Sequence, residues 1–207
     1  MERFLKLGEG APVVIDVLRA SSTIVTALAN GIKEVVPVTS KKEALKLQRQ
    51  DFLIAGEQDG VKLDGFDLGN SPTELLNLLE KQCPQKLAIK TTNATDLLCS
   101  LPEAFVVSIL NLETAKKKLH GKKLSLIAVG SRHGLVEDLI VAVALHMGLN
   151  GLDMNSQWIS KAFLFSEAAK HLGKIGYSED VEFIVNTSYD VLPKLENGTI
   201  HDSTCGY

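Results

Sequence analysis

Short runs of β-branched and other apolar residues alternate with helix-like segments through the first half of this chain. The alternation is typical of an α/β fold, in which helices pack on the sheet between successive strands. A chain of 207 residues is long enough for one sizeable core and short for two. We therefore predict a single domain over residues 1–207, with a three-layer α/β/α fold and a mainly parallel or mixed sheet.

The bounds of the elements follow from hydrophobic periodicity and from glycine, proline and capping residues. The predicted strands are residues 13–15, 34–38, 52–55, 86–90, 104–108 and 124–129. The predicted helices are residues 21–30, 41–50, 71–80, 94–100, 111–120, 136–147, 156–172 and 178–189. We also expect a glycine-rich loop over residues 56–70 and a fraying tail beyond Pro193.

Charge and composition disfavour several classes of protein. A net charge of −3 and an aromatic fraction of 5% argue against nucleic acid as a partner. Residues 1–10 lack the continuous apolar core that is typical of a signal peptide, and no apolar stretch is long enough for a membrane span. Cys83, Cys99 and Cys205 lack metal-binding or redox spacing. We therefore expect a soluble cytoplasmic protein without a membrane partner, in which any bound anion is held by local groups.

Three predicted strands end in clusters of hydroxyl, amide and charged residues that lead into a helix. Ligands of α/β sheets collect outside the carboxyl ends of the strands, where the N–H groups of helix starts favour anions. The clusters therefore predict a site for a small anion, such as the phosphate of an acidic metabolite. The alternative is simple helix capping, which explains the Thr91 cluster well when it is taken alone. The three clusters contain Ser21, Ser22 and Thr23; Thr91, Thr92 and Asn93; and Ser131, Arg132 and His133.

Asp16 and Arg19 are harder to explain by capping. A carboxylate directly after a buried strand is unfavourable unless it is paired or bound to a metal. The arginine three residues later offers a forked donor for two phosphate oxygens. The alternative is a salt bridge between Asp16 and Arg19.

Further carboxylates in the sequence are candidate ligands for a metal ion. Mg²⁺ binds proteins through one or two carboxylates together with water and substrate phosphate. Asp16, Glu57 and Asp67 are therefore candidate ligands. The alternative is that Asp67 and the nearby Asn70 form Asx turns.

The last predicted strand is followed by Arg132, His133, Glu137 and Asp138. Acids in the first turn of a helix complement its dipole, but the two basic residues beside them favour a functional role. His133 is a candidate general acid, although a single loop histidine is more often only hydrogen-bonded. The other histidines show no metal-ligand spacing; they are His120, His146, His171 and His201.

The motifs of common hydrolases are missing from the sequence. It contains no GxSxG, GxxxxGK[ST] or HExxH motif. Leu18 stands where a haloacid dehalogenase-type phosphatase has its second aspartate. Direct attack by a metal-activated water is therefore favoured over an aspartyl-phosphate intermediate.

Five blocks of residues follow one another along the chain. They are residues 15–24 (IDVLRASSTI), 56–57 (GE), 65–72 (GFDLGNSP), 91–93 (TTN) and 130–138 (GSRHGLVED). Together they resemble the 2-phosphosulfolactate phosphatase (ComB-type) family, from about Val13 to Tyr189. The resemblance implies an α/β/α fold and a Mg²⁺-dependent hydrolase that removes phosphate from 2-phospho-3-sulfolactate, a step of coenzyme M biosynthesis.

The substrate implied by this resemblance carries phosphate, sulfonate and carboxylate groups. The predicted catalytic residues are Asp16, Arg19, Glu57, Asp67, Glu137 and Asp138, and the predicted Mg²⁺ ligands among them are Asp16, Glu57 and Asp67. The predicted substrate-binding residues are Ser21, Ser22, Thr23, Asn70, Ser71, Thr91, Thr92, Asn93, Ser131, Arg132 and His133.

The chain departs from the family pattern around the fourth block. Ala94 stands in place of a glycine, Asp96 in place of a basic residue and Lys90 in place of a threonine. A Cβ at position 94 restricts the backbone, so we expect a binding loop of different shape. We also expect a short segment before Asp16.

Two other functions are alternatives to the phosphatase. They are a non-catalytic anion-binding homologue of the same fold and a nucleotide-binding transferase. A homodimer is possible on the sequence evidence.

Overall fold

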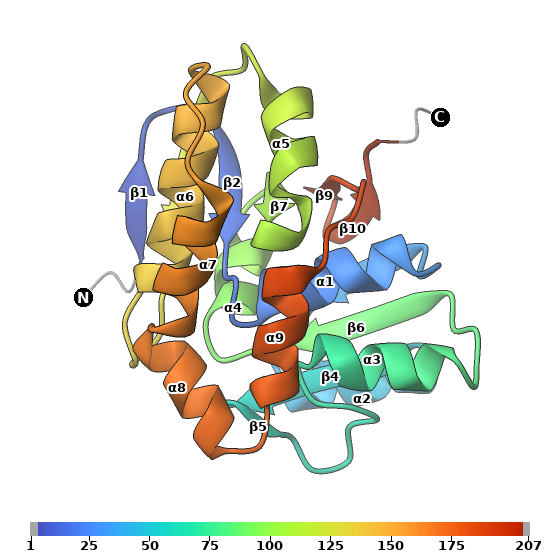
Figure 1. Cartoon of the computed structure of the whole chain (residues 1–207). Coiled ribbons are helices and arrows are strands. Elements are labelled where there is room, and N and C mark those ends of the chain that lie inside the picture. The colour runs from blue at the N-terminus through green and yellow to red at the C-terminus, as the bar shows by residue number, and fades with distance from the viewer. Residues whose placement is uncertain (1–3, 205–207) are drawn as a thin grey trace.

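A computed structural model describes residues 4–204 of the chain. One mixed sheet is covered by helices on both faces, which confirms the predicted α/β class (Figure 1). Cys83 and Cys99 are free thiols, whereas Cys205 lies outside the described residues. Within the described part of the chain, no helix is long and apolar enough to cross a membrane.

The strands of the described residues form a single ten-stranded sheet. Their bounds are β1 (Leu5–Leu7), β2 (Ala11–Ile15), β3 (Glu34–Pro37), β4 (Leu53–Gln58), β5 (Val61–Lys62), β6 (Lys86–Lys90), β7 (Glu103–Val107), β8 (Leu124–Ala128), β9 (Pro193–Glu196) and β10 (Thr199–Asp202). The order across the sheet is β1-β8-β2-β7-β9-β10-β3-β6-β4-β5. Parallel pairing joins β8, β2 and β7 in one half and β3, β6 and β4 in the other.

The two parallel sets run in different directions. In Figure 1, β2 runs downward and β6 runs toward the left, so their carboxyl ends point toward the same region. The loops after β2, β6 and β8 meet the end of β4 there, although these segments are far apart in the sequence. This convergence is what creates the site described below.

Helices lie on both faces of the sheet. Their bounds are α1 (Ala20–Ala29), α2 (Lys41–Gln48), α3 (Pro72–Leu79), α4 (Ala94–Ser100), the 3₁₀ turn η1 (Ile109–Asn111), α5 (Leu112–Leu119), α6 (Val136–Leu149), α7 (Ser156–Leu164), α8 (Glu167–Lys174) and α9 (Ser178–Asn186). The predicted helices from α1 to α6 agree with these bounds to within two residues at each end. Their apolar periodicity and caps were therefore sufficient to find them.

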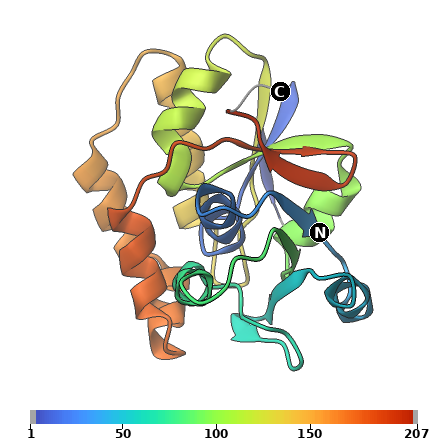
Figure 2. The ribbon, with the colours of Figure 1, turned by 90° about the vertical axis from the view of Figure 1, so that its right-hand side faces the viewer.

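The hairpin β9–β10 joins the two halves of the sheet (red in Figure 2). β9 pairs with β7 and β10 pairs with β3, both antiparallel, and Leu195 and Ile200 are fully buried. The predicted fraying tail beyond Pro193 is therefore wrong. Asn197 and Gly198 have φ values of 52° and 80°, and this residue pair favours the tight turn of a two-residue hairpin.

Three smaller features also differ from the prediction. β1 was not predicted and pairs antiparallel with β8 at one edge of the sheet. β4 continues to Gln58 and pairs with β5, so part of the predicted loop 56–70 is a hairpin. The predicted helix 156–172 is two helices, because Ser166 caps α8 by accepting a hydrogen bond from the Ala169 N–H (3.1 Å).

Alternation along β2 explains the layers. Val13 and Ile15 pack with α5, α6 and α9 on one face, whereas Val14 packs with α1 and α3 on the other. All three residues are fully buried. A strand buried on both faces has a continuous apolar sequence, and helices on both faces give the three layers expected.

Candidate functional site

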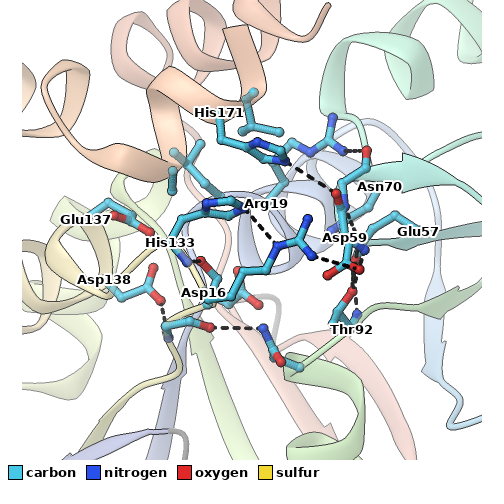
Figure 3. Close-up of a pocket in the computed structure, with 18 residues that line it drawn as sticks. Asp16, Arg19, Glu57, Asp59, Asn70, Thr92, His133, Glu137, Asp138 and His171 are labelled. Atoms are coloured by element: carbon cyan, nitrogen blue, oxygen red, sulfur yellow. Dashed lines mark hydrogen bonds and ion pairs between the residues drawn. The ribbon is translucent and has the colours of Figure 1, made fainter. Parts of the chain in front are cut away.

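A cavity of about 450 Å³ lies where the carboxyl ends of the two strand sets converge (Figure 3). Its walls come from the loops after β2, β6 and β8, the end of β4 with the following turn, and parts of α6 and α8. Of the described residues that line it, two carry guanidinium groups, Arg19 and Arg132, and five carry carboxylates. The five acids are Asp16, Glu57, Asp59, Glu137 and Asp138.

Asp16 follows β2 directly and is only 8% exposed. Its backbone is fixed from both sides, because its N–H donates to Ser21 Oγ (2.9 Å) and its carbonyl accepts from the Ser21 N–H (2.8 Å). Burial raises the pKa of the Asp16 carboxyl to about 7, and the nearby Glu57 and Glu137 add to the rise. A buried carboxylate among other acids is a group that a bound cation would stabilise.

Glu57, in β4, is held by donors from two loops. Its Oε2 accepts from the Gly60 N–H (2.6 Å), and its Oε1 accepts from the N–H (2.7 Å) and the hydroxyl (3.0 Å) of Thr92. These bonds join the β4–β5 turn to the loop after β6. They keep the Glu57 carboxylate, which is almost fully buried, in the wall of the cavity.

Asp138 ties two strand ends together. Its Oδ1 accepts from the Val17 N–H (2.7 Å) and its Oδ2 accepts from the Gly130 N–H (2.8 Å). Burial raises the pKa of the Asp138 carboxyl well above its usual range, and Asp16 and Glu137 add to the rise. Burial also raises the pKa of Glu137, which lies beside it in the first turn of α6. These two acids therefore retain protons more readily than exposed carboxyls do.

Arg19 is fixed by a buried ion pair with Asp180 of α9. Its Nη1 lies 2.6 Å from Asp180 Oδ2, and its Nη2 donates to the Gly60 carbonyl (2.9 Å). The guanidinium carbon lies over the Tyr177 ring, 4.0 Å from its centroid. The ion-pair partner of Arg19 is thus Asp180 and not the neighbouring Asp16.

Arg132, His133 and His171 lie at the solvent side of the cavity, which we call its mouth. Arg132 Nη1 lies 3.2 Å from Asp59 Oδ2. The rings of His133 and His171 stack with centroids 3.9 Å apart, as Figure 3 shows. Burial lowers the pKa of His133, and His171 and Arg132 contribute to this shift.

The structure brings most of the predicted site residues together. Those that line the cavity are Asp16, Arg19, Glu57, Asn70, Thr92, Asn93, Ser131, Arg132, His133, Glu137 and Asp138. Those that do not line it are Ser21, Ser22, Thr23, Asp67, Ser71 and Thr91.

The predicted hydroxyl residues outside the cavity support the loops around it. Ser22 Oγ donates to the Val17 carbonyl (2.7 Å). Ser71 Oγ caps α3 by accepting from the Glu74 N–H (3.1 Å), and it donates to Asp180 Oδ1 (2.8 Å). Of these contacts, only the one between Ser71 and Glu74 is a helix cap, and no side-chain cap hydrogen bond is found at the start of α1 or of α4.

Asp67 is exposed and takes part in the local structure of its loop. Its Oδ2 accepts from the Ile54 N–H (2.8 Å), and its Oδ1 accepts from the Gln48 side-chain amide (3.1 Å). Because both oxygens bond away from the cavity, we leave Asp67 out of the metal site proposed below.

Among the residues at or beside the cavity that were not predicted, Asp59, Gly60, His171 and Asp180 have contacts that shape the site. Asp59 and Gly60 form the turn between β4 and β5, and an Asp-Gly pair between extended segments is a hairpin signal that could have identified it. His171 and Asp180 belong to the amphipathic helices α8 and α9. No local sequence signal distinguishes them from other polar residues on a helix.

The departures from the family pattern lie around the start of α4. Ala94 is buried in the first turn of this helix, a conformation that its Cβ tolerates without strain. Asp96 is exposed, and Lys90 Nζ donates to the Thr91 carbonyl (3.0 Å). None of the three side chains lines the cavity.

The oxygen donors of the cavity suit a small divalent cation. Within residues 4–204, no group of three or more His, Cys, Asp or Glu side chains is arranged to hold a metal. Mg²⁺, however, needs only one or two carboxylates because it retains water and binds substrate phosphate. Asp16 and Glu57 meet this requirement. Asn70 Oδ1 is a further buried oxygen of the wall, without a hydrogen-bond partner among the described residues.

Comparison with known proteins identifies the family. The sequence profile of the family described as 2-phosphosulpholactate phosphatase matches residues 4–198. The chain belongs to this family. A relative from Caldanaerobacter subterraneus subsp. tengcongensis is 35% identical, over 95% of this chain and 92% of its own length. A relative from Thermotoga petrophila is 36% identical, over 90% and 89%. Both are named probable 2-phosphosulfolactate phosphatase.

The family resemblance predicted from the five sequence blocks is thereby confirmed, and this is a family of phosphoric monoester hydrolases. The match reaches beyond the blocks on both sides, to β1 and to the turn of the β9–β10 hairpin. In this member of the 2-phosphosulfolactate phosphatase family, residues from all five blocks line the cavity.

Proposed function

We propose that this protein is a Mg²⁺-dependent phosphatase that hydrolyses 2-phosphosulfolactate to sulfolactate and phosphate. The observation that carries the proposal is the buried carboxylate of Asp16, whose pKa is raised to about 7 in a cavity lined by other acids. Five carboxylates and two guanidinium groups make a poor site for a substrate with three anionic groups. A divalent cation beside Asp16 would make the local charge around the bound phosphate more positive and so favour the anionic substrate.

Asp16, Glu57 and the Asn70 side-chain oxygen are the groups that would hold the cation, together with water. Bound Mg²⁺ supplies neutralisation of phosphoryl charge and a lowered pKa for a bound water. Glu57 is already oriented by Thr92 and Gly60, so little reordering would be needed there. Asp16 is likewise held on a rigid strand end.

Arg19 would bind and orient the phosphoryl group. Its position is determined by Asp180, by the Gly60 carbonyl and by the Tyr177 ring, so its guanidinium requires no ordering when the substrate arrives. A preorganised cation beside the reacting phosphorus stabilises charge that develops on the phosphoryl oxygens.

Glu137 would act as the general acid that protonates the leaving oxygen of the substrate. Burial raises the pKa of its carboxyl, so a proton on its side-chain oxygen is retained closer to neutral pH. As water forms a bond to phosphorus, the bond from phosphorus to the C2 oxygen breaks, and that oxygen takes the proton from Glu137. The proton released by the attacking water then returns to Glu137.

Phosphate release from 2-phosphosulfolactate is the direct test. We expect turnover with added Mg²⁺, less than about 1% of it after treatment with EDTA, and recovery when Mg²⁺ is added back. Asp96→Asn is the matched control, because Asp96 is an exposed acid outside the cavity and should leave this response unchanged. Full turnover in EDTA would contradict the metal requirement, and no turnover under any condition would contradict the function.

The affinity for Mg²⁺ should depend on pH. A proton on Asp16 competes with the cation, and the pKa of this carboxyl in the metal-free protein is about 7. The apparent affinity should therefore fall about tenfold per pH unit below 7 and level off above about pH 8. Calorimetric titration from pH 5.5 to 8.5 measures this, and an affinity that stays constant over that range would argue against Asp16 as a ligand.

A further inference from the structure

We propose that the mouth of the cavity is a second anion subsite, formed by Arg132, His133 and His171, which binds the sulfonate of the substrate. The proposal rests on the proposed function and adds the direction in which the substrate lies. The sulfonate would take the place on Arg132 that the carboxylate of Asp59 holds in the structure.

Most of the acidic groups of the cavity are buried, whereas Arg132 is exposed. Its floor is formed by the buried carboxylates Asp16, Glu57, Glu137 and Asp138. At the mouth, the side chain of Arg132 is 58% exposed, and His133 and His171 are half-buried. A substrate with anionic groups at both ends is therefore repelled from the floor except beside Arg19 or a bound cation. Among the described lining residues, the other guanidinium group is that of Arg132, which lies toward solvent.

The mouth residues come from the loop after β8 and from α8, and both of these elements contact the β4–β5 turn. Arg132 Nε donates to His133 Nε2 (3.2 Å), and the His133 ring stacks on His171 of α8. His171 Nε2 lies 3.5 Å from the backbone oxygen of Asp59, in the β4–β5 turn. A Cβ on Gly60, the next residue, would lie 2.8 Å from Ile175 Cδ1, so the turn packs closely against the end of α8. The mouth is thus an assembled structure and not a set of unrelated surface side chains.

Arg132 has donors available for a ligand. Its Nε is used by His133 and its Nη1 by Asp59, whereas Nη2 has no partner among the described residues. The ion pair with Asp59 is largely exposed to solvent, where such pairs contribute little. An anion with several oxygens can therefore replace Asp59 and engage the guanidinium fork more completely.

The sulfonate is the group that reaches the mouth. In 2-phosphosulfolactate the phosphoester and the carboxylate are both attached to C2, whereas the sulfonate is attached to C3. With the phosphoester at Asp16 and Arg19, the carboxylate stays near the floor and the sulfonate extends farthest from it. A sulfonate also remains ionised at any physiological pH and offers three oxygens to converging donors.

Two substrates that differ only in the sulfonate test this directly. 2-Phospholactate has the carbon skeleton, the phosphoester and the carboxylate of 2-phosphosulfolactate but ends in a methyl group. Arg132→Gln should lower kcat/KM for 2-phosphosulfolactate about 100-fold, in line with the loss of a charge-assisted contact, and for 2-phospholactate less than about 3-fold. Equal losses with both substrates would overturn the subsite.

Two further variants test the individual roles of His171 and Asp59. His171→Phe keeps a ring against His133 but removes the nitrogen donors, and it should lower kcat/KM about 10-fold for the sulfonated substrate only. Asp59→Asn removes the internal anion, and asparagine tolerates the φ of 54° at this position. We expect its KM for 2-phosphosulfolactate to fall several-fold with kcat unchanged, and an increased KM would overturn the role given to Asp59.

A binding measurement separates this proposal from the phosphatase function. If the native protein hydrolyses neither substrate, the proposed function fails, but the subsite is still tested by calorimetric binding of 3-sulfolactate against lactate in the presence of Mg²⁺. Tighter binding of 3-sulfolactate that Arg132→Gln abolishes supports the subsite. Equal binding of the two compounds, or no effect of the substitution, overturns it.

Discussion

Replacing Asp16 with asparagine is expected to abolish phosphate release and, at the same time, to raise the melting temperature of the metal-free protein. Activity should fall on the order of 10³-fold or more, because the amide removes the negative charge that would bind the cation beside the phosphoester. The Ser21 contacts of the backbone are unaffected by the change, so the loop after β2 keeps its shape.

The stabilising effect follows from the pKa of Asp16. Its folded-state value of about 7 lies above the usual value for an aspartate, so ionisation destabilises the fold. This cost is absent below about pH 4, grows as the pH rises toward 7 and is constant above it. Asparagine cannot ionise, so we expect the variant to melt about 5 °C higher at pH 8, with a smaller gain at pH 5.

Thermal melts at pH 5 and pH 8, in EDTA alone and with Mg²⁺ in excess over EDTA, measure the expected change in stability, and a phosphate-release assay measures the loss of activity. Mg²⁺ should raise the melting temperature of the native protein but not that of Asp16→Asn, since the cation stabilises only the protein that binds it. Asp96→Asn serves again as the control. A variant that melts lower than the native protein at pH 8 would show that Asp16 supports the fold rather than the site.

Replacing Asp180 with alanine is expected to be the most destabilising substitution in the site. Asp180 is fully buried and pairs with Arg19, and its Oδ1 also accepts from the hydroxyls of Ser71 (2.8 Å) and Thr73 (2.6 Å). Its removal leaves a buried guanidinium without a counter-charge. Breaking such a pair costs about 3–5 kcal/mol, which corresponds to a fall in melting temperature of about 10 °C for a chain of this size.

The same substitution should lower kcat/KM, because Arg19 loses the contact that orients it toward the phosphoryl group. The double variant Arg19→Met with Asp180→Leu separates the two effects. Apolar residues of similar size can replace a buried ion pair at little cost, so we expect the double variant to recover most of the stability but none of the activity. If it melts as low as Asp180→Ala, the unpaired charge is not the cause of the loss.

The features that sequence could predict are those set by neighbours along the chain. The apolar run Val13-Val14-Ile15 identified β2 because both of its faces are buried. Ser71 and Pro72 identified the start of α3, where Ser71 does cap the helix. The Asn197-Gly198 pair carried an equally local signal for the β9–β10 hairpin, and reading it as a fraying tail was an error of interpretation.

The features that sequence could not predict depend on partners distant along the chain. Asp180 lies 161 positions from Arg19, and its sequence context is that of any acid in the first turn of a helix. His171 reaches His133 only because α8 packs beside the loop after β8. Asp67 shows the reverse case: it belongs to a predicted block, but its hydrogen bonds to Ile54 and Gln48 turn its carboxylate away from the cavity.

By itself, the sequence determined the α/β class, the strand-end clusters, the family and most of the residues that line the cavity. Such signals arise from burial, turn geometry and capping, which act within a few residues. Only the tertiary structure decided that the carboxyl ends of two differently directed strand sets meet, that Arg19 pairs with Asp180, and that Asp16 is surrounded by other acids. The physical reason is that ion pairs, burial and pKa shifts depend on distance in space, which the order of residues along the chain does not specify.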